Sequence, residues 1–144
     1  MLTLNDPIKS PAPIVITDEH FTLTEVKYLD VKQFSSRASK ERVSISDTNN
    51  TLWFHIKDFH ELVGCCGLYL AKKKCRIKGD WILPQYRGKG FGEFITQCRL
   101  HIAKELDYEL IEVLTLHPHY YEAKGFTIHK ETRKGVWLAD KEIL

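Results

Sequence analysis

Hydrophobic positions recur along the chain with two different periods, and the changes of period mark its elements. Residues 21–26 alternate apolar and polar side chains, which predicts a short strand. Residues 28–42 have a helical spacing, which predicts one or two short helices. Apolar runs then predict three strands, at residues 52–56, 62–70 and 75–83, with a hairpin at 58–61.

The strongest helical pattern starts at Phe91, where apolar residues recur every three or four positions for about four turns. Residues 110–116 follow as a nearly continuous apolar run, which predicts a strand buried on both faces. Pro118 can open a short helix and Gly125 can close it, before a final hairpin at 126–138. We expect the solvent-facing side of the long helix to hold mostly Glu93, Gln97, Arg99, Lys104 and Glu105.

This order of elements predicts an α+β fold: a mixed, mostly antiparallel sheet flanked by helices. The strands at 77–83 and 110–116 are joined through a helix and should therefore be parallel. Residues 1–18 contain Pro7, Pro11 and Pro13, and predict an extended lead-in without regular structure. The length of 144 residues predicts a single domain over residues 1–144.

Composition and charge mainly exclude classes of partner and of site. The net charge of +2 is too small to favour nucleic acid or a membrane surface as a partner. The sequence has no apolar stretch of membrane-spanning length and no signal peptide, so we expect a cytoplasmic protein. Cys65, Cys66, Cys75 and Cys98 lack C-x-x-C or zinc-finger spacing, and predict reduced, buried thiols and no metal site.

The candidate chemistry lies in the turn at residues 84–92, where a predicted strand passes into the long helix. Gly88, Gly90 and Gly92 allow the backbone to turn sharply and to approach a ligand closely. The unpaired N–H groups of a helix start attract an anion, and Arg87 and Lys89 add positive charge. The turn therefore predicts a phosphate-binding site.

Two common phosphate-binding loops do not fit. A Walker A loop needs Ser or Thr after its lysine, and Lys89 is followed by Gly90. A dinucleotide fingerprint needs a different glycine spacing and an acid ending the next strand, where Thr115 and Leu116 stand.

A third pattern fits. Gln85-x-x-Gly88-x-Gly90 resembles the Q/R-x-x-G-x-G/A signature of the GNAT acetyltransferase superfamily, whose turn binds the coenzyme A pyrophosphate. Residues 117–126, His-Pro-His-Tyr-Tyr-Glu-Ala-Lys-Gly-Phe, resemble the short helix and following strand of the same family. The resemblance covers most of residues 21–138.

The resemblance implies a GNAT fold that binds acetyl-CoA as cosubstrate between two splayed parallel strands, here 77–83 and 110–116. Backbone groups of Ile82 and Leu83 would bond the pantetheine arm and polarise the thioester. The pyrophosphate would be held by the turn and helix start: Gln85, Arg87, Gly88, Lys89, Gly90, Phe91 and Gly92.

The implied reaction is direct attack of a primary amine on acetyl-CoA, without a metal. The family's usual acid is a tyrosine of the short helix, which is Tyr121 here, with Tyr120 or a purely packing role as alternatives. The glutamate that many members place before the turn is missing. Asp80, His117, His119 and water all stay open as the base.

Two other functions stay open. A CoA-binding or sensory module without catalysis would explain the missing carboxylate. A toxin that acetylates aminoacyl-tRNA has only the lysines at 72–74 and a pI near 8.3 in its favour. The acceptor amine is undetermined, and a homodimer, common in the family, is left open.

Overall fold

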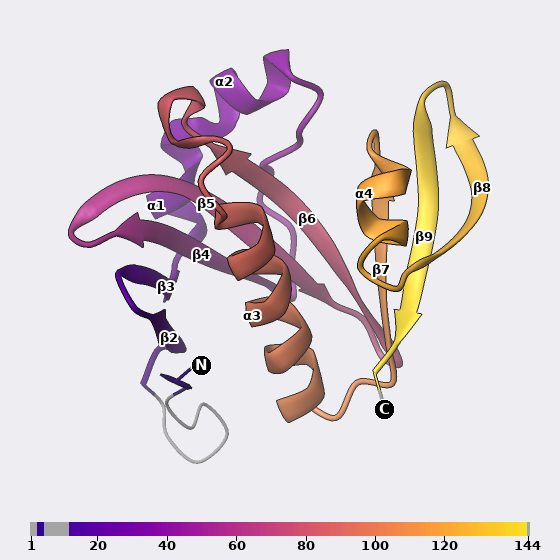
Figure 1. Cartoon of the computed structure of the whole chain (residues 1–144), viewed down its shortest axis with the longest axis horizontal. Coiled ribbons are helices and arrows are strands. Elements are labelled where there is room, and N and C mark those ends of the chain that lie inside the picture. The colour runs from indigo at the N-terminus through magenta and orange to yellow at the C-terminus, as the bar shows by residue number, and fades with distance from the viewer. Residues whose placement is uncertain (1–2, 5–11, 144) are drawn as a thin grey trace.

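The computed structural model describes residues 3–4 and 12–143, and its elements alternate along the chain much as the hydrophobic pattern predicts (Figure 1). In chain order they are β1 (Thr3–Leu4), β2 (Val15–Asp18), β3 (Phe21–Val26), α1 (Tyr28–Val31), a 3₁₀ helix (Lys32–Phe34), α2 (Ser35–Lys40), β4 (Thr51–Asp58), β5 (Glu61–Leu70), β6 (Lys74–Ile82), a second 3₁₀ helix (Pro84–Tyr86), α3 (Phe91–Glu105), β7 (Leu110–Thr115), α4 (Pro118–Glu122), β8 (Thr127–Arg133) and β9 (Val136–Glu142).

The described strands form one sheet in the order β1-β2-β3-β4-β5-β6-β7-β9-β8. Neighbours are antiparallel except β6 and β7, which are parallel. α3 covers one face of the sheet, and α1 and α2 cover the other (Figure 1). The predicted mixed, mostly antiparallel α+β fold is confirmed.

Each face of the sheet has its own core. Phe54 and Ile102 belong to the cluster under α3, whereas Phe34 and Trp81 belong to the cluster under α1 and α2. Burying a large apolar side chain of this kind stabilises the fold by about 1.5–3 kcal/mol. The four cysteines are free and buried, as predicted.

The amphipathic helix predicted from Phe91 is α3, and it buries the apolar positions that set its period. One residue departs from the prediction. The sequence predicts Arg99 on the solvent-facing side of the helix, but its side chain is fully buried, with 0% exposure. A buried guanidinium is tolerated because Asp80 and the carbonyl of Gly67 bind it, and periodicity alone cannot reveal such partners.

The predicted irregular lead-in is wrong where the structure describes it. β1 pairs with β2, and β2 pairs with β3, so the sheet extends beyond the first predicted strand. Ile14 and Ile16 are buried, because alternate residues of this segment face the core. Pro13 lies just before β2, where the strand does not need its missing N–H. Residues 1–2 and 5–11, including Pro7 and Pro11, lie outside the described residues.

Candidate functional site: a cleft between two splayed strands

β6 and β7 pair over only part of their lengths. Their register runs from Lys74 opposite Leu110 to Ile77 opposite Val113. β6 continues to Ile82, but the two strands have no pairs beyond Ile77 and diverge from there (Figure 1). The strands therefore open a gap in the middle of the sheet.

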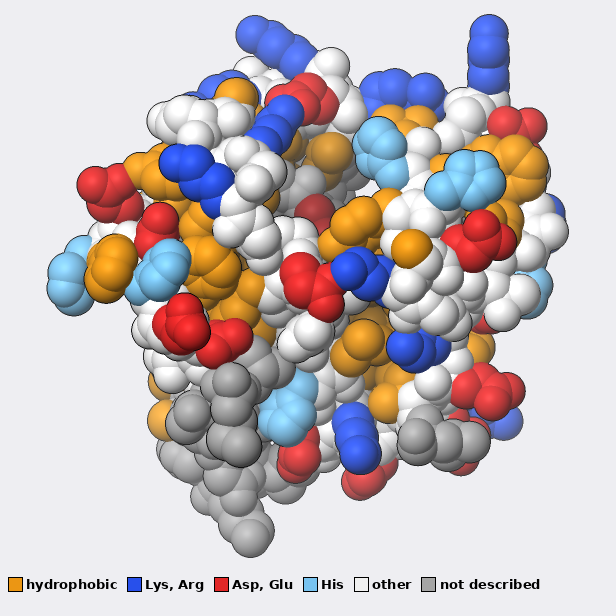
Figure 2. Space-filling view, in the orientation of Figure 1, with side chains coloured by type: hydrophobic (Ala, Val, Ile, Leu, Met, Phe, Trp, Pro, Cys, Tyr) orange, Lys and Arg blue, Asp and Glu red, His pale blue; other side chains and the backbone are white. Residues whose placement is uncertain are grey.

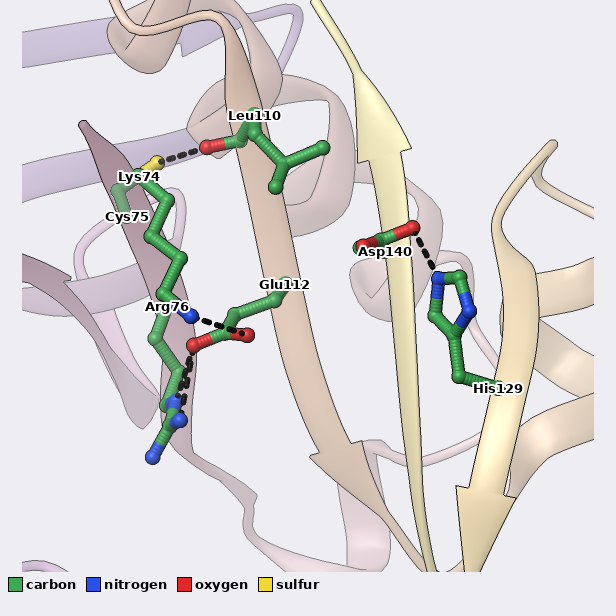
Figure 3. A network of polar contacts seen from close by, with 7 residues as sticks. All are labelled: Lys74, Cys75, Arg76, Leu110, Glu112, His129 and Asp140. Atoms are coloured by element: carbon green, nitrogen blue, oxygen red, sulfur yellow. Dashed lines mark hydrogen bonds and ion pairs between the residues drawn. The ribbon is translucent and has the colours of Figure 1, made fainter.

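An ion-pair cluster closes the narrow end of this gap (Figure 3). Glu112 of β7 is 4% exposed and accepts hydrogen bonds from Arg76 Nε at 3.0 Å and Nη2 at 2.8 Å. Lys74 Nζ lies 3.3 Å from the other carboxylate oxygen of Glu112. Charge-assisted bonds between the two strands hold them together one residue before they part.

A β-bulge turns β6 away from β7. The pairing of β5 with β6 shifts register between Cys65 and Gly67, so that Gly79 and Asp80 of β6 together lie opposite Cys66 of β5 and β6 has one extra residue. Gly79 has φ +67°, and a Cβ there would come within 2.5 Å of the Trp53 ring. Only glycine fits this position, and a bulge bends the strand that carries it.

A cavity of about 1440 Å³ follows the gap, and Figure 2 shows it as a hollow near the centre of the face. Its lining comes from both sides of the sheet. We call the part at the start of α3 the helix arm: Gly88, Gly90, Phe91, Gly92, Glu93 and Thr96. We call the part near the segment between α2 and β4 the loop arm: Arg42, Ser44, Thr48, Lys78 and Arg133.

The helix arm is built from backbone donors. α3 starts at Phe91 behind the N-cap Gly90, which has φ +95° and gives no side-chain cap. The first amide bonded to the N-cap carbonyl is that of Phe94, at 3.2 Å. The N–H groups of residues 91–93 therefore lack helical partners, and the positive end of the α3 dipole lies at the cleft.

The glycines before α3 leave room for a ligand. A Cβ at Gly88 would meet nothing within 4 Å, and one at Gly90 would meet only Phe21, at 3.8 Å. Both residues have φ in the left-handed region. A Cβ at Gly92 would instead come within 3.0 Å of the Tyr120 hydroxyl, which reflects packing against α4. The open, donor-lined space fits a diphosphate.

The predicted coenzyme residues divide into two groups. Ile82, Arg87, Gly88, Gly90, Phe91 and Gly92 line the cavity, whereas Leu83, Gln85 and Lys89 do not. The Arg87 side chain is also not a mobile charge. Its guanidinium pairs with Glu41 at 2.8 and 2.9 Å and donates from Nε to the Ile82 carbonyl at 2.8 Å.

The glycine spacing also fits the family signature in a second frame, two residues further along the chain. Arg87-x-x-Gly90-x-Gly92 satisfies the same Q/R-x-x-G-x-G/A signature. In this frame the two glycines are the N-cap of α3 and a residue of its first turn. The sequence alone does not decide between the two frames, because only the structure shows at which residue α3 starts.

Ile82 and Leu83 differ in the direction of their backbone N–H groups. The Leu83 N–H donates to the Val63 carbonyl at 2.8 Å, and its carbonyl accepts from the Tyr86 N–H at 2.9 Å. Successive amides of a strand point to opposite edges, so the Ile82 N–H points away from β5 and into the gap. Leu83 is thus occupied within the protein, and Ile82 is the available backbone donor.

Tyr121 lies in the cleft, and its ring is fixed by packing against two other aromatic rings. It is 9% exposed and packs edge-on against Phe126 and Tyr120, with ring centroids 5.2 and 5.1 Å away. Its hydroxyl has no hydrogen-bond partner among the described residues, and the residue lines the cavity. Burial, with the negative charge of Asp80 as a smaller cause, raises the pKa of Tyr121 above its ordinary value. The phenol therefore stays protonated and can donate.

Asp80 and Arg99 form a pair beside this tyrosine that sequence reasoning missed. The guanidinium of Arg99 binds both carboxylate oxygens of Asp80, with Nη2 to Oδ2 at 2.6 Å. Asp80 lines the cavity but is already occupied as an acceptor. Only the bulge at Gly79, which directs Asp80 towards α3, brings the two residues together.

The other candidate bases lie in different places. His117 lines the cavity, whereas His119 does not; its side chain is 88% exposed and lies 3.3 Å from Glu122. No group of His, Cys, Asp and Glu side chains among the described residues could hold a metal ion. None of the helices within residues 12–143 combines the length and apolar character needed to cross a bilayer.

Solved structures share this architecture at low sequence identity. A GNAT acetyltransferase from Elizabethkingia anophelis with acetyl-CoA bound has a TM-score of 0.65 and 14% identity, covering 87% of this chain and 99% of its own. The spermidine N-acetyltransferase of Vibrio cholerae has a TM-score of 0.70 and 16% identity, covering 88% and 95%. No curated protein sequence matched the chain.

A third similar structure is a larger protein. The N-acetylglutamate synthase of Neisseria gonorrhoeae, in complex with coenzyme A and N-acetyl-glutamate, has a TM-score of 0.72 and 11% identity. The similarity covers 89% of this chain and 36% of that protein. These likenesses establish a shared fold.

The family follows from the sequence itself. The sequence model of the acetyltransferase (GNAT) domain matches residues 48–128, which is more than half of the chain. The matched segment contains the splayed strands, the turn before α3, and α4 with Tyr121. The chain belongs to the GNAT acetyltransferase family.

Proposed function

We propose that the protein transfers an acetyl group from acetyl-CoA to a primary amine, as a single domain over residues 1–144. The observation that carries this proposal is the gap between β6 and β7, which ends at the helix arm. A gap lined by strand edges can admit a narrow pantetheine arm, while the donors at the helix start bind its diphosphate. The four buried, free thiols suit a reducing compartment, which supports the cytoplasm.

The backbone donors that would hold the coenzyme are those of Gly88 to Glu93, together with Ile82. Fixed N–H groups stabilise an oxyanion as it develops, and the loss of one such donor costs about 3–4 kcal/mol in other enzymes. The Ile82 N–H points into the gap and suits the carbonyl oxygen of a thioester. The Glu41–Arg87 pair holds the turn in place.

The chemistry requires two proton movements. An amine nitrogen attacks the thioester carbon, the carbon–sulfur bond breaks, and the departing thiolate takes a proton. Tyr121 suits this donation because its pKa is raised and its hydroxyl has no partner within the described residues. For the proton that the ammonium loses, the cleft offers His117 or solvent water, since Asp80 is engaged by Arg99.

Two measurements test this function. Calorimetry with acetyl-CoA should show saturable binding, and a thiol-detecting assay with a broad amine panel should show turnover. Binding without turnover over the whole panel would instead favour a CoA-binding or sensory module. The absence of binding would contradict the proposal altogether.

A further inference from the structure

The charges that line the cleft are unevenly balanced, and the imbalance lies in the loop arm. Each carboxylate that lines the cavity already has a cationic partner. Glu41 pairs with Arg87, Asp80 with Arg99, and Glu93 with Lys124. These residues leave no net negative charge with which the cleft could attract a cationic acceptor.

Three cations of the loop arm have no carboxylate partner among the described residues: Arg42, Lys78 and Arg133. Arg42 reaches across to the β8–β9 turn, where Nη2 donates to the Lys134 carbonyl at 3.2 Å. Lys78 Nζ donates to the Thr48 hydroxyl at 3.1 Å. The loop arm therefore presents uncompensated positive charge.

Partial burial makes this charge more effective. Lys78 is half-buried and lies 5.5 Å from the centre of the Trp53 ring. Burial first, and then the positive charge of Arg76, lower the pKa of Lys78. An anion close to Lys78 would offset both the burial of its charge and the repulsion from Arg76, because charges interact more strongly away from bulk water.

These cations lie on the wrong side of the sheet to serve the diphosphate. Ile77 packs in the core under α3, so Lys78, the next residue of the strand, points to the opposite face. The Trp53 ring under Lys78 belongs to the core on the α2 side. The helix arm, with its backbone donors, lies at the start of α3 on the other face. The two arms can thus bind two different anionic groups.

We propose that the acceptor amine carries a carboxylate, as an amino acid does, and that Arg42, Lys78 and Arg133 bind this carboxylate in the loop arm. The inference rests on the proposed acetyl transfer and adds the chemical class of its acceptor. A polyamine, which is positive along its length, is a poor match for this arm.

Matched acceptor pairs test the proposal directly. Amino acids and their own carboxamides share the side chain and the amine but differ in the anion. Because the two amines ionise differently, kcat/KM should be measured over pH and the pH-independent limits compared. We expect the carboxylates to exceed the carboxamides by about tenfold or more, the usual range for a charge-assisted hydrogen bond. Spermidine should be a poorer substrate than either.

Charge-removing variants locate the effect. Arg133→Gln and Lys78→Gln should each raise KM for the amino acid severalfold and shrink the difference between carboxylate and carboxamide. The affinity for acetyl-CoA should stay within about twofold of its original value, since the helix arm is untouched. Lys130→Gln removes a charge from the same strand as Arg133 but outside the cavity, and should change neither.

Three results would overturn the proposal. Equal or faster turnover of carboxamides or spermidine would refute the carboxylate preference while acetyl transfer itself stands. Weaker acetyl-CoA binding in Arg133→Gln, with an unchanged acceptor KM, would assign these cations to the coenzyme. No thiol release with any amine would refute the transferase function and this inference with it.

Discussion

The two arms of the cleft are built on different principles. The helix arm lies within one short stretch of the chain, residues 88–96, and offers the free main-chain N–H groups of the first turn of α3, whereas the loop arm consists of side chains from distant segments, at positions 42, 78 and 133. No substitution other than proline removes a backbone donor, but a single substitution can change a charge. The helix arm is therefore suited to one constant ligand, and the loop arm to a ligand that differs between relatives.

Tyr121 and the neighbouring Asp80–Arg99 pair belong to neither arm of the cleft. Here the backbone of the β6 bulge decides where the side chains go, since Gly79 directs Asp80 towards α3. This region thus combines both principles, and substitutions there should have the largest effects.

Removal of the Tyr121 phenol should have the largest effect on activity. Tyr121→Phe keeps the ring that packs on Phe126 but removes the proton donor. We expect kcat to fall by about 10²- to 10⁴-fold, the usual contribution of a general acid, with acetyl-CoA affinity nearly unchanged. Thiol release and calorimetry would measure the two quantities. Tyr120→Phe is the matched control, and a larger loss there would reassign the acid.

The Asp80–Arg99 pair should dominate stability. Asp80→Ala leaves the fully buried Arg99 without its carboxylate, which costs about 3–5 kcal/mol in comparable pairs. We expect the lower end of this range, because the Asp80 side chain is 29% exposed. Urea unfolding would measure the loss.

A double variant tests whether Asp80 and Arg99 stabilise the fold as a pair. Asp80→Leu combined with Arg99→Met should recover much of the stability, because neither charge is then left unpaired. A double variant as unstable as the sum of its single variants would show that the two residues do not act as a pair.

A substitution in the helix arm should have a smaller effect, on both stability and binding. Gly90→Ala places a Cβ on a residue with φ +95°, which should cost about 1–2 kcal/mol. If the backbone shifts enough to lose one amide–phosphate bond, acetyl-CoA affinity should fall by about tenfold. Calorimetry would show this. Lys89→Gln, outside the cavity, should leave the affinity unchanged, and a comparable loss there would shift the site to side-chain charge.

The smallest expected effect is on the alkaline side of the pH profile. Because the pKa of Tyr121 is raised above the ordinary 10.0, the donor stays protonated at pH values where an exposed phenol would ionise. With saturating acceptor, kcat should rise as the amine loses its proton and then stay level to pH 10. A falling limb below pH 10 that disappears in Tyr121→Phe would contradict the raised pKa.

Sequence reasoning succeeded where the physical signal is local. The period of α3, its start behind Gly88 and Gly90, and the place of Tyr121 on a short helix all depend on residues close together in the chain. It failed for Arg99, whose burial depends on Asp80 nineteen residues earlier, and for β2, which is a strand because β3 pairs with it. Non-local partners leave no periodic signal.

The sequence by itself determined the family, the order of elements from β3 onwards and the glycine-rich turn before α3, because glycine spacing and helix polarity are properties of consecutive residues. Only the tertiary structure decided that β6 and β7 separate after Ile77, that Leu83 is occupied while Ile82 faces the gap, and that three cations without a carboxylate partner among residues 12–143 share one arm. Those features depend on strand register and on distances between remote residues, which folding fixes and the linear order does not contain.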